Sequence, residues 1–129
     1  MHHAARLVFV AMFTALFQPS LAAAQSQAEG KNLYSAYCVI CHGDQGKGDG
    51  AGAKALPQKP ADHTDGAVMN QLSDKFLFDV ISKGGGAVGK STFMPSWGAA
   101  LNEKQIRDIV AFLRTIAAPA YKAEIPVKK

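Results

Sequence analysis

The two cysteines of the chain lie three residues apart, and a histidine directly follows the second. The segment reads Cys38-Val39-Ile40-Cys41-His42, and the sequence contains no other cysteine. Residues three apart on a helical turn present their side chains on the same side. The segment therefore predicts one site that holds two thiols and an imidazole, around which the rest of the chain must fold.

Several kinds of site share this spacing, and a chance match is one alternative. A redox disulfide would be expected in a strand–helix–strand context, which does not precede the motif. A zinc site would need more ligands, but the chain has no second cysteine pair, and His63 stands at the wrong spacing from His42 for a zinc finger. The Cys-x-x-Cys-His pentapeptide is the signature of covalent haem attachment, in which both thiols add to one haem and the histidine binds its iron, and we prefer this interpretation.

The N-terminal segment has the order of a secretory signal peptide. Residues 1–6 are short and basic, residues 7–17 are apolar apart from Thr14, and Ala22-Ala23-Ala24 provides a small-residue cleavage site. The apolar run is shorter than the roughly 20 residues that span a bilayer. We expect residues 1–24 to be removed on export, to the periplasm if the source is a Gram-negative bacterium. A retained membrane anchor is the alternative.

Helical periodicity marks three segments, and none alternates as a strand would. Helices are predicted over residues 28–37, over residues 74–83 after a Ser73 cap, and from Asn102 to Pro119, where Gln105 completes a capping box. The loops between them are too long for an ordinary bundle, so we expect them to wrap a bound group. The sequence predicts one all-α domain over residues 25–118 and a C-terminal tail over residues 119–129.

A phosphate-binding motif is also present by its letters. Residues 84–91 read Gly-Gly-Gly-Ala-Val-Gly-Lys-Ser, which matches G-x-x-x-x-G-K-S. A P-loop joins a buried strand to a helix, but Pro95 would end or kink that helix. The chain also lacks room for the parallel sheet that supports such a site. We therefore reject nucleotide binding, and we expect these glycines to let the chain turn closely over the bound group.

The chain after residue 24 resembles a class I, monohaem cytochrome c over almost its whole length. The resemblance rests on the haem motif just after the first helix and on Met94-Pro95 in the loop before the last helix. Four further positions resemble the family's pair of packed terminal helices: Gly30, Tyr34, Ile109 and Phe112. The family's fold has three to five helices and long loops wrapped round one covalent haem, with one edge exposed.

This resemblance implies one haem c, held by Cys38 and Cys41, with His42 and Met94 as the axial ligands of the iron. A methionine thioether is soft and neutral, so it favours ferrous iron and raises the potential. Met94 could instead be an ordinary core methionine. The alternative sixth ligands are Met69, which precedes a helix, and His63, which we expect on the surface beside Asp62 and Asp65.

Residues around the haem can also be assigned from the resemblance. The family uses a proline carbonyl to accept a hydrogen bond from the haem histidine; Pro57 and Pro60 are both in range, and Pro57 is preferred. Trp97 is expected either near a haem propionate or in the core. The lysines in or beside the loops form either a solvated surface or a basic docking face: Lys47, Lys54, Lys59, Lys83 and Lys90.

The function implied by the resemblance is one-electron transfer between redox partner proteins outside the cytoplasm, without enzymatic conversion of a substrate. Loss of residues 1–24 removes Arg6 and lowers the formal net charge from +4 to +3, a mild value that argues against strong nucleic-acid binding. No stable membrane insertion is expected after signal cleavage. An open-site haem protein, of the peroxidase-like or gas-binding kind, is the alternative if Met94 is not a ligand.

Overall fold

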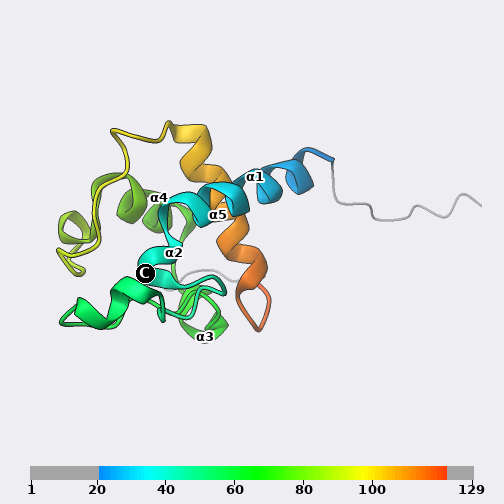
Figure 1. The fold of residues 1–129 in the computed structure, drawn as a ribbon. Helices are drawn as coiled ribbons and strands as arrows, with labels where there is room; N and C mark the ends of the chain where they lie inside the picture. The colour runs from blue at the N-terminus through cyan, green and yellow to red at the C-terminus, as the bar shows by residue number, and fades with distance from the viewer. Residues whose placement is uncertain (1–20, 122–129) are drawn as a thin grey trace, which may run out of the picture.

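The computed structural model describes residues 21–121, which form helices joined by long loops (Figure 1). Among these residues there is no strand. The all-α prediction is therefore confirmed. The helices, with two short 3₁₀ segments labelled η, are α1 (Leu21–Tyr37), α2 (Val39–His42), η1 (Ala51–Ala55), α3 (Gly66–Met69), α4 (Asp74–Lys83), η2 (Gly85–Val88) and α5 (Glu103–Ile116).

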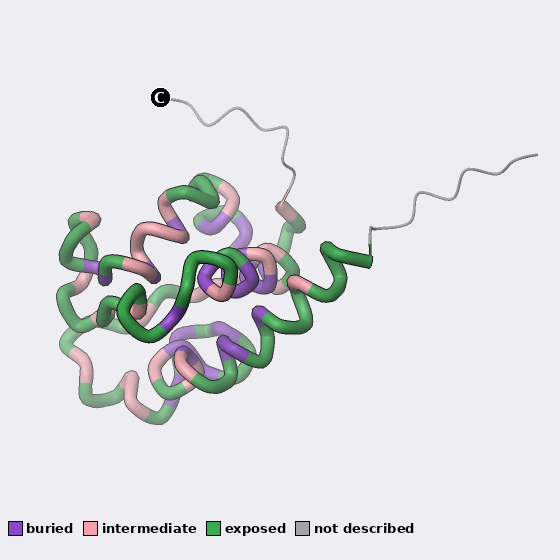
Figure 2. Tube along the Cα trace, turned by 90° about the horizontal axis from the view of Figure 1, so that it is seen from above, coloured by how far each residue is buried: buried purple, intermediate pink, exposed green. Residues whose placement is uncertain are grey.

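The first and last helices cross each other, as Figure 1 shows for α1 and α5. The crossing is close because Gly30 has no side chain: a Cβ there would collide with the backbone carbonyl of Asp108. One turn later, the Tyr34 and Phe112 rings pack together, with their centroids 5.3 Å apart. Ile109 is 1 % exposed at the same crossing. The packing expected of the four family positions is thus present, and buried residues concentrate in the interior of the described chain (Figure 2).

Local capping fixes where α4 and α5 begin. The Asn102 side chain accepts from the Gln105 amide at 3.0 Å, and the Gln105 side chain accepts from the Asn102 amide at 2.9 Å. Ser73 caps α4 by accepting from the Phe76 amide. Each cap satisfies helix N–H groups that have no partner within the helix. Both predicted starts are confirmed, while α5 ends at Ile116, three residues before Pro119.

The first helix is longer than its periodicity predicts, because it begins at Leu21 rather than at residue 28. Alanine is the strongest helix former, so the alanines at 22–24 extend the helix. The Ser26 hydroxyl also donates to the Asp108 carboxylate at 2.6 Å, which ties this extra turn to α5. The first 20 residues of the predicted signal peptide and tail residues 122–129 lie outside the described residues.

The P-loop-like segment has no strand before it. It follows α4 and contains η2, and its first glycines, Gly84 and Gly85, lie against the methionine loop. The Gly85 amide donates to the Met94 carbonyl at 3.0 Å, and the Lys90 amide donates to the Gly85 carbonyl at 2.8 Å. A Cβ at Gly85 would collide with the Ser91 carbonyl. These glycines therefore allow a tight turn beside residues 90–95. Within residues 21–121, no helix has the length and apolar character needed to cross a bilayer.

We predict that Gly30→Val lowers the free energy of unfolding by at least about 1–3 kcal/mol, because a side chain cannot fit between the two backbones. The control is Ala36→Val on the exposed side of α1, where only the helix propensity changes, by less than about 1 kcal/mol. Denaturant unfolding of both variants measures the difference. Equal midpoints and slopes would show that the helices do not cross at Gly30.

Candidate functional site

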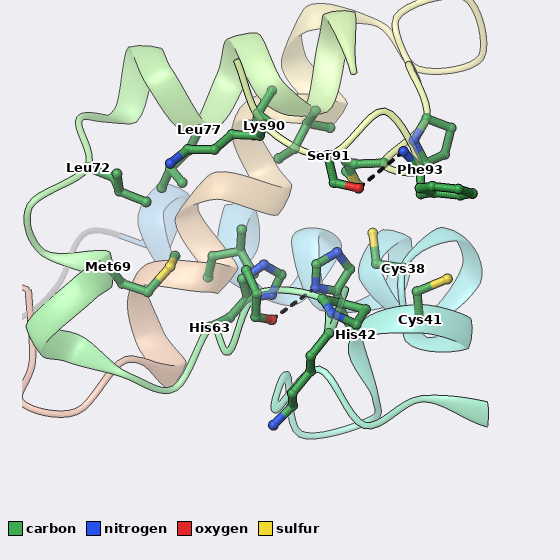
Figure 3. Close-up of a pocket in the computed structure, with 18 of the residues that line it drawn as sticks. Cys38, Cys41, His42, His63, Met69, Leu72, Leu77, Lys90, Ser91 and Phe93 are labelled. Atoms are coloured by element: carbon green, nitrogen blue, oxygen red, sulfur yellow. Dashed lines mark hydrogen bonds between the residues drawn. The ribbon is translucent and has the colours of Figure 1, made fainter. Parts of the chain in front are cut away.

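The cysteines and the histidine lie on one turn that continues from α1. The Cys38 amide donates to the Tyr34 carbonyl at 2.8 Å, and the His42 amide donates to the Cys38 carbonyl at 2.9 Å. Figure 3 shows both thiols side by side with the His42 ring on the same wall of a cavity. Both cysteines are free thiols, and burial raises the pKa of Cys38 to about 12. The predicted grouping of two thiols and an imidazole is present.

The cavity has a volume of about 370 Å³, within the usual range for small-molecule and cofactor sites. One wall is formed by the cysteine–histidine turn and by the loop through residues 56–63. The facing wall is formed by α4 and residues 90–95, and α5 contributes Ile109 and Leu113. Most of the lining is apolar. Such a space suits a mostly apolar group of cofactor size better than a small hydrophilic one.

The His42 ring is held by a backbone carbonyl, as the family pattern implies, but that carbonyl belongs to Ala61. The His42 Nδ1 lies 3.2 Å from the Ala61 oxygen (Figure 3). The prediction of Pro57, with Pro60 as the alternative, is therefore wrong. The Pro60 carbonyl packs against Gly48 instead, where a Cβ would collide with it. The chain then turns so that the next carbonyl faces the ring.

This hydrogen bond determines which His42 nitrogen can bind a metal. With Nδ1 donating to Ala61, the lone pair is on Nε2, the form in which histidine serves as a ligand. Burial lowers the pKa of His42, and the hydrogen bond to Ala61 opposes this shift in part. The ring is thus kept neutral and correctly oriented. Tyr34 supports the same turn, because its hydroxyl donates to the Gly43 carbonyl at 3.0 Å.

His63 lies in the cavity wall and not on the surface, where we expected it. Its ring stacks on the His42 ring, with centroids 4.3 Å apart and planes at 19°. Burial and the neighbouring His42 lower the pKa of His63 to about 3, and its Nδ1 is buried without a hydrogen-bond partner. Because the two rings lie side by side, His63 cannot reach the opposite face of a group bound by His42. It is not a sixth-ligand candidate.

Two methionines line the cavity, and they come from different elements. Met94 belongs to the loop whose Ser91 and Phe93 lie across the cavity from His42 (Figure 3). Met69 ends α3, is 1 % exposed, and lies toward the end of the cavity away from the thiols. Trp97 is absent from the lining and packs edge-on against Tyr37, with centroids 5.3 Å apart, so it belongs to the core.

The donor set fits haem better than a bare metal ion. Within residues 21–121, no three side chains of His, Cys, Asp or Glu come together as a metal site. This argues against the zinc alternative. What the site offers instead is two thiols and one oriented imidazole at the edge of an apolar cavity, which matches the needs of a haem attached through its vinyl groups.

Comparison with known proteins agrees with a haem cofactor. Residues 25–113 match the family model described as cytochrome C oxidase, cbb3-type, subunit III. The chain belongs to this family. Its members carry c-type cytochrome domains. The family therefore implies haem c as the cofactor and haem-based electron transfer as the function. The predicted resemblance to class I cytochromes c is confirmed at this level.

A curated relative is the Cbb3-type cytochrome c oxidase subunit FixP of Azorhizobium caulinodans, which is 29% identical over 89 residues. That alignment covers 68% of this chain and 26% of FixP, so the chain spans about a quarter of the length of this relative.

Two solved structures share the fold of the chain. The KustC0563 c-type cytochrome has a TM-score of 0.56 at 22% identity, over 68% of this chain and 96% of that one. The Kuenenia stuttgartiensis reducing HAO-like protein complex Kustc0457/Kustc0458 also gives 0.56, at 25% identity, over 78% and 50%. The cytochrome c fold prediction is thus confirmed.

Proposed function

We propose that this chain carries one haem c, bound covalently at Cys38 and Cys41, and works as a one-electron carrier between redox proteins. The observation that supports this most strongly is that both free thiols and the His42 imidazole open onto the same apolar cavity. Family membership supplies haem-based electron transfer in general. The single haem, the covalent bonds and the ligand pair are the proposal.

Each thiol would attach by adding across one vinyl double bond. Sulfur bonds to one vinyl carbon and the thiol hydrogen goes to the other, so that no oxidant is needed. The raised pKa of Cys38 keeps that hydrogen on the sulfur beforehand. When bound, haem supplies a one-electron ferric–ferrous couple. The chain holds His42 in place through Ala61, and its apolar walls keep water away from the iron.

We propose Met94 as the second axial ligand. Its loop faces the His42 wall across the cavity, and the hydrogen bond from the Gly85 amide to the Met94 carbonyl holds the loop there. Met69 lies toward the end of the cavity instead (Figure 3). A second ligand would have to face His42 across the cavity, as the Met94 loop does, which favours Met94.

Replacing each methionine with leucine gives a matched pair, because leucine removes the sulfur while nearly preserving the volume. Met94→Leu should lower the reduction potential and let carbon monoxide bind the ferrous protein, since the soft ligand is lost. Met69→Leu should leave the six-coordinate, low-spin spectrum intact. Absorption spectra and redox titrations measure both effects. An unchanged spectrum in Met94→Leu, with a changed one in Met69→Leu, would show that Met69 and not Met94 is the second axial ligand.

We propose that partners approach the cysteine end of the cavity. Ile40 lies between the two cysteines and is 60% exposed, and Phe93, 56% exposed, lies above the thiols (Figure 3). The lysines of the predicted docking face differ in their surroundings. Lys59 and Lys90 line the cavity, but the Lys90 side chain points away from the cysteines (Figure 3), and Lys83 pairs with Asp79 at 2.9 Å. The relative FixP is an oxidase subunit, so we propose redox proteins as the partners of this chain too.

Stopped-flow electron exchange tests this carrier function. The reduced protein should pass one electron to an acidic redox partner faster than to a basic one, and the faster rate should fall as salt rises, because opposite charges steer the encounter. The effect should be modest, since the net charge is small. Fast turnover of peroxide with a reducing substrate would contradict a carrier role and support the open-site alternative.

We propose further that the chain is exported and that residues 1–24 are removed, which gives a periplasmic protein in a Gram-negative source. The support is the order of basic, apolar and small residues at the N-terminus. N-terminal sequencing of the haem-loaded protein should begin at Gln25. A sequence beginning at Met1 would point instead to a retained membrane anchor.

A further inference from the structure

One wall of the cavity carries an exposed lysine, Lys90, that has no carboxylate partner within residues 21–121, whereas the other lysine of the lining, Lys59, lies near Asp62 and helps to lower the pKa of that carboxyl. The described residues that line the cavity include Lys59 and Lys90 but no aspartate or glutamate. Lys90 runs along the wall formed by α4, with its Nζ 6.0 Å from the centroid of the Phe76 ring. Figure 3 shows its side chain pointing toward Leu72 and Leu77, away from the two thiols. Among the described residues, Lys90 forms no ion pair.

A second polar group lies toward the same end. Figure 3 places His63 on the side of His42 that is away from the cysteines. Its buried Nδ1 lacks a hydrogen-bond partner. Other residues toward this end include the apolar Met69, Leu72 and Leu77. A buried polar atom without a partner is costly, so a bound group that supplies one at this end would be favoured.

The chemistry of haem determines which of its groups reaches that end. Its two vinyl groups and its two propionates occupy opposite edges of the porphyrin ring. Attachment at Cys38 and Cys41 fixes the vinyl edge at the thiol end, so the propionates face the other end. Two carboxylates in mostly apolar surroundings are costly unless a cation or hydrogen-bond donors pair with them.

We infer that Lys90 is the counter-charge for the haem propionates, and that His63 presents its unpartnered nitrogen at the same end. This inference rests on the haem attachment proposed above. The backbone at residue 90 is fixed beside the cavity, because the Lys90 amide donates to the Gly85 carbonyl at 2.8 Å. The lysine of the P-loop-like motif thus pairs with an anion. That anion is a carboxylate of the cofactor and not a nucleotide phosphate.

The test compares Lys90→Gln with Lys31→Gln in the haem-loaded protein. Lys31 is an exposed lysine of α1 outside the cavity lining, so the control removes the same charge elsewhere. Lys90→Gln should lower the midpoint potential, because a nearby positive charge favours the reduced iron. It should also shift the propionate bending bands in the resonance Raman spectrum, which respond to hydrogen bonding. Lys90→Arg should retain most of the wild-type behaviour.

The possible results separate this inference from the function on which it rests. If Lys90→Gln and Lys31→Gln behave alike, Lys90 does not pair with the propionates. If Lys59→Gln moves the bands and Lys90→Gln does not, the counter-charge is Lys59 and the inference is wrong. A wild-type protein without attached haem would overturn the proposed function itself. A band shift confined to Lys90→Gln, largely restored by arginine, supports the pairing.

Discussion

The crossing of α1 and α5 at Gly30 fixes both walls of the cavity relative to each other. On one side, the crossing places the end of α1, from which the cysteine–histidine turn continues through the hydrogen bond of Cys38 to Tyr34. On the other side, α5 carries Arg114, which donates to the Met69 carbonyl at 2.7 Å and to the Asp74 carboxylate at 2.8 Å. These bonds tie α3 and the start of α4 to the same helix. A shift at the crossing would therefore move both walls.

Backbone groups, more than side chains, position the His42 ring and the Met94 loop. The Ala61 carbonyl orients His42, and the Gly85 amide holds the Met94 loop. Neither interaction depends on the side chain of the residue that supplies it. What each requires is a chain path that brings the backbone close, and Gly48 and Gly85 allow that path because a Cβ at either position would collide with a carbonyl.

The features that the sequence predicts well are those set by local chemistry. The cysteine–histidine motif, the caps at Ser73 and Asn102, and the apolar spacing of the last helix each depend on residues a few positions apart. The contact of Gly30 with α5 was predicted from the family resemblance and not from local spacing. The four-residue helix α3 was not predicted, because a single turn is too short to show helical periodicity.

The features that the sequence did not predict depend on contacts between distant segments. Asp62 and Asp65 suggested an exposed His63, yet both carboxylates serve their own turns: Asp62 accepts from Thr64, and Asp65 caps α3. They leave the histidine free to point inward. The choice of Ala61 over the two prolines likewise follows from how residues 60–63 pack on Gly46 and Gly48. No spacing rule carries that information.

The measurement that tests the central claim most directly is mass spectrometry of a tryptic digest of the coloured protein. Cleavage after Lys31 and Lys47 releases residues 32–47, which contain both cysteines. If haem is attached as proposed, this peptide carries the mass of one haem, and neither cysteine reacts with an alkylating reagent. The same peptide at its bare mass, with both cysteines alkylated, would contradict covalent haem attachment at Cys38 and Cys41.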